Sequence, residues 1–360
     1  MASKRLFDLP VTRGSFQLRG HVSGVESQNF YTEKETKTGN TFRKVNFGVA
    51  YDDHKSVYLT LTGMPRELVY FTKKDKNTNK TESKPVKWAN RKSFNEDGFR
   101  MIGISAGLQQ IRNEDGSVEN VVQTLTDFDA CEYLSAYLED DMSVYVNGNL
   151  DFSSFVTNTG EVRRQINYVP SRIYSAKAPI DFDSDKYKPT HTFEQTIVYR
   201  GIEQEMDGDK ATGRFIMSAY VVNYNSIEMV EFIVENKALA SACKKYMKPY
   251  WSFTVNGVIE VKNHIDEVKK ESPWGTPNPN KRVRFASTRE MIVTGIDCDD
   301  DNEPIVDNET YTAKEIEKAL KAIYNAQNAE SSFGESDDEE EDVDWGTDGD
   351  SDNDDEGQPW

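Results

Sequence analysis

Two stretches of the chain share a nine-residue pattern that decides the fold. Ser143-Val-Tyr-Val-Asn-Gly-Asn-Leu-Asp151 aligns without gaps with Ser252-Phe-Thr-Val-Asn-Gly-Val-Ile-Glu260. Both stretches alternate β-branched or aromatic residues with polar ones, which is typical of a β-strand. Each follows a short helical pattern, at 129–138 and 236–247. The chain therefore contains an internal repeat, and each copy includes a helix followed by a strand.

The order of elements around the repeat predicts the fold class. An Arg-Gly pair in a predicted strand gives a second match, Leu18-Arg-Gly-His-Val22 with Tyr199-Arg-Gly-Ile-Glu203. Each copy then has three strands, a helix and two strands, which is the order of the OB-fold, a five-stranded barrel. We therefore predict an all-β protein with minor helices, built from two tandem OB-fold barrels. The strands are expected at 15–26, 41–51, 56–63, 142–152, 162–174, 192–205, 213–223, 226–234, 250–262 and 288–297, and the helices at 128–139 and 236–247.

The two copies differ in length, which gives the domain organisation. Gly20 and Gly148 are 128 positions apart, whereas Gly201 and Gly257 are 56 apart. We predict a first domain over 1–178 with a basic, aromatic insertion at about 64–126. A second domain is expected over 190–329, ending in a helix over 312–328 that packs on the barrel through Ile316, Leu320 and Ile323. The remainder, 330–360, is too acidic and too poor in apolar residues to fold, so we expect a disordered tail.

Charge is segregated along the chain. The formal net charge is −19, and residues 330–360 hold fifteen Asp and Glu with no Lys or Arg. Residues 1–110 hold nineteen Lys and Arg against eleven Asp and Glu, a local net charge of +8. The acidity of the whole chain therefore does not exclude nucleic acid as a partner of the body.

Several function classes are disfavoured by what the sequence lacks. Cys131, Cys243 and Cys298 are far apart, with no C-x-x-C pair and no His in ligand spacing, so we expect neither a metal nor a cofactor. The acidic turn Asp297–Asp301 has no partner ligands and is expected to be a solvated loop. No phosphate-binding glycine loop or catalytic motif is present, so we expect a protein that is not an enzyme. There is no apolar leader and no run of eighteen apolar residues, so we expect a cytoplasmic protein without a membrane partner.

The outer face of the first predicted barrel carries the candidate binding residues. Binding a single nucleic-acid strand requires cations for the phosphates and exposed rings on which bases stack. An OB barrel presents them on its second and third strands and on the loops joining strands one to two and four to five. One aromatic residue on a strand usually packs across strands, so the prediction rests on the whole set. The expected DNA contacts are Arg19, His21, Phe30, Tyr31, Lys34, Lys37, Phe42, Arg43, Lys44, Tyr58, Lys73, Lys74, Lys87, Trp88, Arg91, Phe155, Arg163 and Arg164.

The second predicted barrel leaves two alternatives open. Its candidates are Arg200, Arg214, Tyr220 and Tyr224, and its last long loop carries Trp274, Lys281, Arg282, Arg284 and Phe285. Either this barrel binds DNA, or its main role is to hold a dimer together or to hold the first barrel in place.

The tail ends in a distinctive way. Its last residues are Asp354-Asp355-Glu356-Gly-Gln-Pro359-Trp360, and a terminal Trp has no intramolecular reason to be there. Capture in a basic pocket of a partner, where carboxylates and ring are bound together, would explain it. The same tail could compete with DNA for the basic face of its own chain.

These features together resemble the single-stranded DNA-binding proteins of bacteriophages. Gly98-Phe-Arg-Met-Ile-Gly103 and Leu125-Thr-Asp-Phe-Asp-Ala130 are similar to segments of such proteins. The resemblance implies coating of single strands during phage replication, recombination and repair, with the tail recruiting polymerase, helicase or primase. Bacterial relatives usually end in Pro-Phe and have one OB-fold per chain, whereas this chain ends in Pro359-Trp360 and has two predicted copies. Stoichiometry is therefore open, with a homo-oligomer among the alternatives.

Two other functions remain alternatives at this stage. An RNA-binding OB protein would use the same stacking surfaces, because base stacking does not distinguish RNA from DNA. A protein-interaction scaffold, or an acidic mimic of DNA, would use the tail rather than the barrels.

Overall fold

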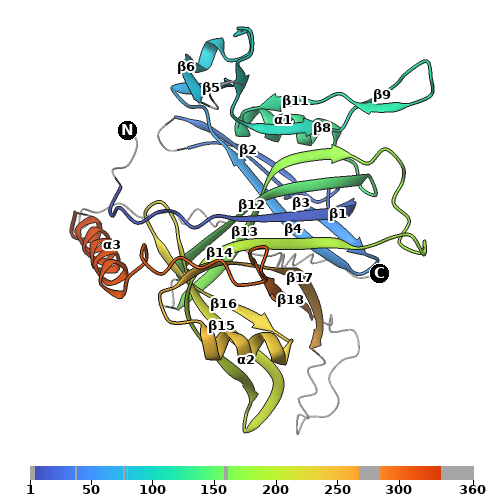
Figure 1. Cartoon of the computed structure of the whole chain (residues 1–360). Coiled ribbons are helices and arrows are strands. Elements are labelled where there is room, and N and C mark those ends of the chain that lie inside the picture. The colour runs from blue at the N-terminus through green and yellow to red at the C-terminus, as the bar shows by residue number, and fades with distance from the viewer. Residues whose placement is uncertain are drawn as a thin grey trace, which may run out of the picture.

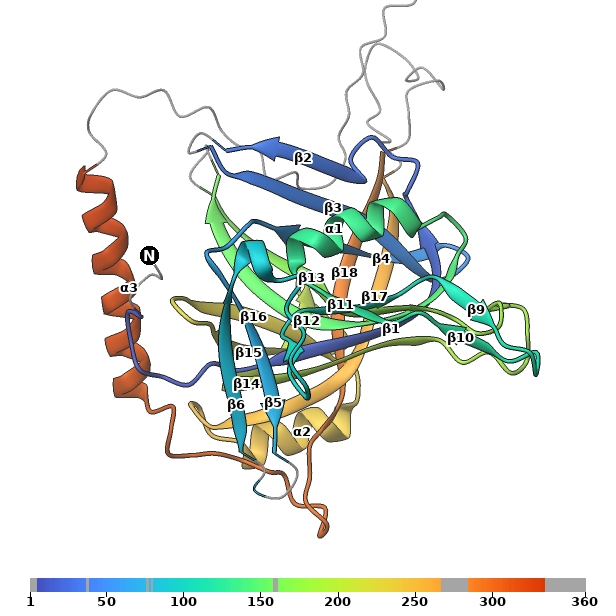
Figure 2. The same ribbon diagram turned by 90° about the horizontal axis from the view of Figure 1, so that it is seen from above.

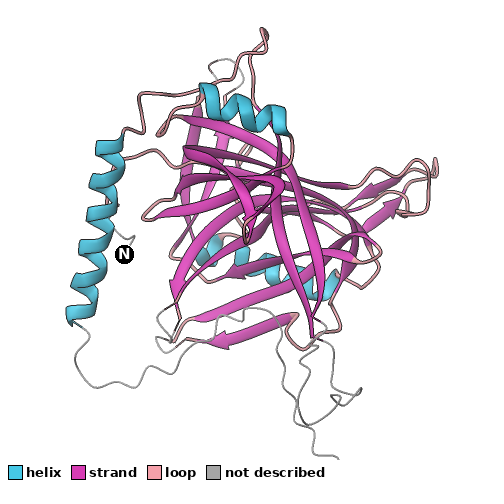
Figure 3. Cartoon of the chain, turned by 90° about the horizontal axis from the view of Figure 1, so that it is seen from below, coloured by secondary structure: helices cyan, strands magenta, loops and turns pink. Residues whose placement is uncertain are grey.

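The structure is a computed structural model, and it describes residues 5–36, 39–75, 78, 80–157, 161–266 and 284–333. Within these ranges the chain is mostly β, with three α-helices at the periphery of the strands (Figures 1 and 3). This confirms the predicted all-β class with minor helices. No described helix is both long enough and apolar enough to cross a membrane. Three groups of predictions fall outside the described residues. They are Lys37, the loop candidates Trp274, Lys281 and Arg282, and the tail from residue 334 on with Asp354, Asp355, Glu356, Pro359 and Trp360.

The second repeat forms a closed barrel, called barrel 2 below. Its strands pair in the cyclic order β14-β15-β16-β18-β17-β14, and only the β16–β18 pair is parallel. A closed sheet leaves no unpaired strand edge, and this order is that of an OB-like barrel. Helix α2 lies between the third and fourth strands, and the Asn236 side chain caps it by accepting hydrogen bonds from the backbone of Ala238 and Leu239. The elements are β14 (Thr190–Asp207), β15 (Lys210–Val222), β16 (Ile227–Val234), α2 (Lys237–Tyr246), β17 (Ser252–Asp266) and β18 (Arg284–Ile296).

The first repeat forms barrel 1, and its insertion takes part in the sheet. β1 pairs with β3 and β12, β3 pairs with β4, and β12 pairs with β13. The sequence predicts the insertion only as a segment between strand and helix. In the structure, strand β8 of the insertion runs parallel to β13, at the place that the third strand occupies in barrel 2. The elements are β1 (Gly14–Ser23), β2 (Tyr31–Glu35), β3 (Thr41–Asp52), β4 (Lys55–Gly63), β8 (Ile104–Gly107), α1 (Asp127–Tyr137), β12 (Ser143–Val156) and β13 (Val162–Ser175).

The rest of the insertion forms two small β units. Strands β6, β5 and β7 make a sheet with its own core of Val69, Phe71 and Val86, against which Trp88 and neighbouring rings pack. Strands β9 and β10 make a hairpin, and β11 pairs with β8. The elements are β5 (Leu68–Lys74), β6 (Thr81–Lys87), the 3-10 turn η1 (Trp88–Asn90), β7 (Arg100–Met101), β9 (Gln110–Arg112), β10 (Val118–Asn120) and β11 (Gln123–Leu125).

The two barrels join through their first strands. β1 and β14 pair antiparallel, and Phe16 lies opposite Phe193. Each of these rings also lies opposite the glycine of its own repeat motif, Gly148 for Phe16 and Gly257 for Phe193. A Cβ atom on Gly148 would lie 2.5 Å from the Phe16 ring, and one on Gly257 would lie 2.9 Å from the Phe193 ring, so glycine is required at both places. The barrels are therefore related by an approximate two-fold axis near the Phe16–Phe193 pair.

This register corrects one part of the repeat alignment. Because Phe16 and Phe193 are equivalent, Arg19-Gly20 corresponds to Thr196-Ile197 and not to Arg200-Gly201. The latter pair lies four residues further along β14, at an irregularity in the pairing with β15. A Cβ atom on Gly20 would lie 1.6 Å from the carbonyl oxygen of Ala50, whereas Gly201 has open space around it. The two glycines therefore serve different purposes.

The long hairpin of each barrel reaches the other barrel. The backbone N–H of Val261, on β17, donates to the Tyr51 hydroxyl at 3.0 Å. On the other side of the axis, the Asn223 side chain donates to the carbonyl oxygen of Phe152, on β12, at 2.8 Å. Buried apolar residues of both barrels form one continuous core. The barrels are thus packed into one body rather than linked as separate beads.

Helix α3 (Ala313–Phe333) follows barrel 2 and lies along one side of the molecule (Figures 1 and 2). Ile316 and Ala319 are buried together with Leu9 of the N-terminal segment and Val222 of β15. Leu320, which the sequence predicts as a packing residue, is exposed instead. The side of the helix that packs on the barrel therefore includes Ala319 in place of the predicted Leu320.

Candidate nucleic-acid interface

The outer face of β3 and β4 carries polar and aromatic side chains, as the alternation predicts. Val45 and Phe47 on β3 and Leu59 on β4 are buried, so their neighbours point outward. Asn46 and Thr60 are directly opposite across the strands, and the Thr60 hydroxyl donates to the Asn46 side-chain oxygen at 2.9 Å. This face carries three of the predicted contacts, Phe42, Lys44 and Tyr58, with Asn46 beside them.

Tyr58 is the most exposed aromatic ring of this face, and barrel 2 supplies its neighbour. The Tyr58 side chain is 49% exposed. The guanidinium of Arg289, on β18, lies 5.6 Å from its ring centroid. Lys55 on β4 also forms an ion pair with Glu260 on β17. The β17–β18 hairpin therefore flanks the outer face of barrel 1, which sequence reasoning did not anticipate because the contact joins residues from different repeats.

The tip of the β12–β13 hairpin is a second exposed surface. Phe155 lies directly opposite Arg163, and Arg164 is opposite Ser154. Phe155 is 40% exposed, and both arginines are exposed. The aliphatic pair Val156 and Val162 beside them is more exposed still. Apolar side chains at a hairpin tip have no packing role within the described residues, so this surface suits a ligand with flat rings and negative charges.

The β2–β3 hairpin lies on the same side of the molecule as that tip, the side along which α3 runs (Figure 2). Its Lys34 is exposed. Phe30, however, is only 7% exposed and belongs to the hydrophobic core, so no base can stack on it. This corrects the expected role of Phe30: the bend before β2 turns its ring inward.

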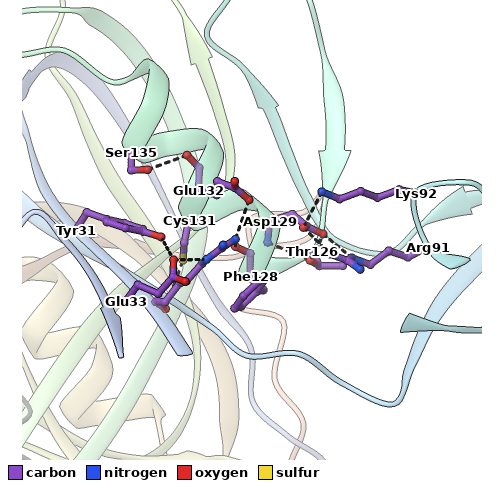
Figure 4. Close-up of polar contacts among 11 residues, drawn as sticks. Tyr31, Glu33, Arg91, Lys92, Thr126, Phe128, Asp129, Cys131, Glu132 and Ser135 are labelled. Carbon is purple, nitrogen blue, oxygen red and sulfur yellow. Dashed lines mark hydrogen bonds and ion pairs between the residues drawn. The ribbon is translucent and has the colours of Figure 1, made fainter. Parts of the chain in front are cut away.

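Arg43 and Tyr31 are engaged in a structural network rather than offered to a ligand. The Arg43 guanidinium donates to Glu33 at 2.9 Å and to Glu132 of α1 at 2.8 Å. The Tyr31 hydroxyl donates to Glu33 at 2.5 Å. Burial and this hydrogen bond raise the pKa of Tyr31 to about 12, and the hydrogen bonds from Tyr31 and Arg43 lower the pKa of Glu33. The network ties the hairpin to α1, so we correct the expected direct DNA contacts of Arg43 and Tyr31 (Figure 4).

Arg91 and Trp88 fasten the insertion to the same helix. Arg91 donates two hydrogen bonds to the Asp129 carboxylate, both at 2.7 Å (Figure 4). The Arg91 guanidinium also lies 3.9 Å from the Trp88 ring centroid. Thr126 caps α1 and also donates to Asp129. Burial alone would raise the pKa of Asp129, but the hydrogen bonds from Arg91 and Thr126 lower it to about 2. We predicted Trp88 and Arg91 as DNA contacts from the sequence. In the structure these two residues hold the insertion against α1 instead.

The lysines of the insertion lie on its surface. Lys74 and Lys87 are exposed, and the Lys73 ammonium donates to the carbonyl oxygen of Asp97 at 2.9 Å. They add positive charge beside the network of Arg91. Phe71, Trp88, Phe94 and Phe99 belong to the core of the insertion, whereas Tyr70 on β5 is exposed.

Arg19 and His21 lie on a different side of barrel 1. Residues of the segment between β13 and β14 contact both of them. The His21 ring hydrogen-bonds through Nε2 to the carbonyl oxygen of Ile180 at 2.8 Å and stacks on Phe182. The Arg19 guanidinium lies 5.4 Å from the ring centroids of both Tyr145 and Tyr187. Neither residue joins the outer face of β3 and β4, which corrects their expected place.

Three cations of barrel 2, Arg200, Arg214 and Lys262, contact side chains of the same barrel. Arg214 pairs with Glu290 at 2.5 Å, and Lys262 pairs with the same carboxylate at 2.8 Å. Burial would raise the pKa of Glu290, but the hydrogen bonds from Lys262 and Arg214 lower it. The Arg200 guanidinium lies 4.9 Å from the Tyr220 ring. Among the residues that the structure describes, no group of three or more His, Cys, Asp or Glu side chains could hold a metal ion.

Comparison with known proteins gives a family. The model of the YorF family matches residues 73–336, more than half of the chain. The chain belongs to the YorF family. No curated protein matches the chain. Among solved structures, this YorF member is similar to the single-stranded DNA-binding protein of Thermus aquaticus, in its wild-type form at 9% identity and as a deletion mutant at 10%. Both matches have a TM-score of 0.37, and they cover 80% of this chain and 93–94% of the other.

Proposed function

We propose that this YorF-family protein binds single-stranded DNA through barrel 1. The observations that carry the proposal are two exposed surfaces, one with Tyr58 on β4 and one with Phe155, Arg163 and Arg164 at the β12–β13 tip. Rings supply stacking surfaces for bases, and the arginines beside them supply charge for phosphates. No sequence-reading hydrogen-bond pattern is needed for such binding, so we expect little dependence on base sequence.

The central experiment is fluorescence anisotropy with labelled poly-dT, poly-U and duplex DNA over a salt series. We expect tight binding to poly-dT that weakens as salt rises, because phosphate contacts release counterions, and much weaker binding to duplex, whose bases are not available for stacking. Equal affinity for duplex and single strand, or none for either, would refute the proposal. Stronger binding to poly-U than to poly-dT would favour the RNA-binding alternative.

A matched variant pair locates the surface. Phe155→Ala and Tyr58→Ala should each weaken poly-dT binding, whereas Phe30→Leu, a change in the core, should alter stability but not the affinity of the folded protein. Unchanged affinity for both surface variants would place the binding surface elsewhere and leave the scaffold alternative standing.

We propose further that the acidic tail competes with DNA and recruits replication proteins. Fourteen Asp and Glu follow Phe333, the last residue of α3. A truncation after Phe333 keeps the whole helix and should bind DNA more tightly at low salt, with the difference vanishing at high salt. A truncation that leaves low-salt affinity unchanged would rule out competition by the tail.

The biological role follows from the same proposal. We propose that the chain coats single strands during phage DNA replication, recombination and repair in the cytoplasm of the host, and that Pro359 and Trp360 dock on a polymerase, helicase or primase. Binding of the full chain and of Trp360→Ala to each purified replication protein of the same genome tests this. Equal binding by both would refute a role for the terminal ring.

A further inference from the structure

A row of one cation and two rings crosses the outer side of barrel 1, away from the surface just described. Arg19 on β1 lies directly opposite Tyr145 on β12, and Tyr145 lies directly opposite Tyr174 on β13. The Arg19 guanidinium lies 5.4 Å from the Tyr145 ring centroid, and the hydroxyls of Tyr174 and Ser105 are hydrogen-bonded at 2.7 Å. Tyr145 is nevertheless 43% exposed. The row thus has fixed geometry and an open face.

The row is the floor of a cleft of about 730 Å³. One wall is the insertion, with Glu119, Asn120 and Val122, and the other is the segment Ser175–Pro179 after β13, which carries Lys177. Two hydrogen bonds hold the walls together. The Asn120 side chain donates to the carbonyl oxygen of Ser175 at 2.8 Å, and the Gln110 side chain donates to that of Ala176 at 3.0 Å. The cleft is therefore preformed, and its walls come from two segments far apart in the sequence.

The cleft and the proposed DNA surface lie at opposite ends of one strand. β13 begins at the hairpin tip with Arg163 and Arg164 and reaches Tyr174 near its end, with the exposed Arg172 between. The β9–β10 hairpin and the segment that follows β13 lie on the side of the molecule away from α3 (Figures 1 and 2). A strand of nucleic acid that follows β13 would therefore pass arginines at both ends of its path.

The fold does not require this row, as barrel 2 shows. By the pairing registers, the equivalents of Arg19, Tyr145 and Tyr174 are Thr196, Thr254 and Asp297. Thr196 and Thr254 simply hydrogen-bond to each other through their hydroxyls at 3.0 Å. The same barrel position is thus stable with small polar residues, so the exposed ring of Tyr145 is not explained by packing.

We propose that the cleft is a second contact for single-stranded DNA, with a base stacked on Tyr145 and the adjoining phosphates between Arg19 and Lys177. This rests on the proposed function, and it extends the binding path from the β12–β13 tip to the far side of the barrel. The chemistry favours a nucleotide, because flat rings and two cations converge on one cleft in which Glu119 is the single carboxylate among the lining residues.

The test uses the full chain and the residues that barrel 2 has at the same positions. The double variant Arg19→Thr/Tyr145→Thr should bind an oligo-dT of about 8 nucleotides like the wild type and one of about 30 nucleotides about tenfold more weakly, because only the longer strand reaches the cleft. Lys177→Ala, on the exposed wall, should weaken only the long oligonucleotide in the same way without touching the sheet. The matched control is Lys245→Thr/Tyr246→Thr, another exposed cation and ring, on α2, which should leave both affinities unchanged.

Photocrosslinking gives a direct reading of the contact. A long oligonucleotide carrying 5-iodouracil should crosslink to the peptide containing Tyr145, and the double variant should lose that crosslink. Equal affinity of variant and wild type for the long strand, with crosslinks only at the β12–β13 tip and β4, would overturn the inference while leaving the proposed function intact. Failure of both oligonucleotides to bind the wild type would refute the proposed function itself. A third outcome would also overturn the inference. If a peptide of residues 346–360 abolishes the crosslink while the double variant binds the long strand as tightly as the wild type, the cleft is a site for an acidic peptide.

Discussion

Barrel 1 and barrel 2 share one fold but use equivalent positions for opposite purposes. The register counted outward from Phe16 and Phe193 makes Glu231 the equivalent of Tyr58. The same count makes Arg214, which is enclosed by carboxylates, the equivalent of Lys44. The outer face of barrel 1 therefore offers a ring where barrel 2 offers a negative charge. A fold of this kind fixes where an outer face lies, and the side chains on it decide whether nucleic acid can bind there.

The helices of the two barrels differ in the same manner. α2 begins with a capping asparagine alone, whereas α1 begins with a capping threonine and a buried carboxylate paired to the insertion. The insertion is thus an integral part of barrel 1, and the comparison predicts unequal costs when each helix start is altered.

The largest effect is expected at this pair of helix starts. Arg91→Ala removes both guanidinium hydrogen bonds from the buried Asp129 carboxylate and leaves it the Thr126 hydroxyl and the Lys92 ammonium at 3.4 Å. We expect the free energy of unfolding to fall by about 2 kcal/mol. Asn236→Ala at the start of α2 should cost only about 1 kcal/mol. Urea unfolding followed by circular dichroism measures both. Equal losses would show that the insertion is not needed to hold α1.

The pH dependence sharpens this result. The pKa of Asp129 is about 2 in the folded chain against 3.8 for an ordinary aspartate, so its pairing stabilises the fold above pH 3.8 and loses that effect as the pH falls toward 2. The stability difference between wild type and Arg91→Ala should therefore be smaller at about pH 3 than at about pH 6. A difference that stays constant would mean that Arg91 acts by packing on Trp88 and not by its charge.

The sequence predicts the barrels better than it predicts the binding residues. Alternation and the repeated Asn-Gly strand suffice to place the strands, because a half-buried strand must alternate. Arg43 and Arg91 look like DNA contacts in the sequence, but Glu132 and Asp129, which pair with them, become neighbours only when α1 packs on the sheet. The contact of Arg289 with Tyr58 could not be predicted for a related reason, since nothing in the sequence around Arg289 shows that β18 reaches barrel 1.

A reciprocal exchange at Tyr58 and Glu231 tests the main contrast. Tyr58→Glu replaces a stacking ring by a charge that repels phosphate, so poly-dT affinity should fall by more than tenfold, on the order of the value of one stacked base. Glu231→Tyr should change affinity little, because Arg214 and Lys262 of barrel 2 are already paired with carboxylates. Anisotropy titrations at one fixed salt concentration measure both. A larger loss from the change in barrel 2 would reverse the assignment of the two barrels.

Salt dependence separates rings from charges at the β12–β13 tip. Arg163→Ala/Arg164→Ala removes two phosphate contacts, so the slope of log affinity against log salt should become shallower by about 1.5. Phe155→Ala should lower affinity at every salt concentration without altering the slope, because stacking releases no counterions. Arg200→Ala in barrel 2, whose guanidinium lies on Tyr220, is the control and should leave the slope unchanged. A slope that responds to Phe155→Ala instead would mean that the tip rearranges when its ring is lost.

The smallest expected effect concerns the contact of Arg289 in barrel 2 with Tyr58 on the surface of barrel 1. Arg289 lies over Tyr58, and a guanidinium over an exposed ring is worth about 0.5–1 kcal/mol. In a double-mutant cycle of Tyr58→Ala and Arg289→Ala, the poly-dT affinities should show a coupling free energy of that size. The reason is that Arg289 acts by orienting the Tyr58 ring, so its effect is lost when that ring is removed. Additive losses would mean that Arg289 contacts DNA independently, so that barrel 2 has a binding role of its own. Coupling together with a loss from Arg289→Ala that persists at high salt would instead make Arg289 a support for the ring, because a phosphate contact would lose its value as salt rises. The division of labour between the barrels would then hold.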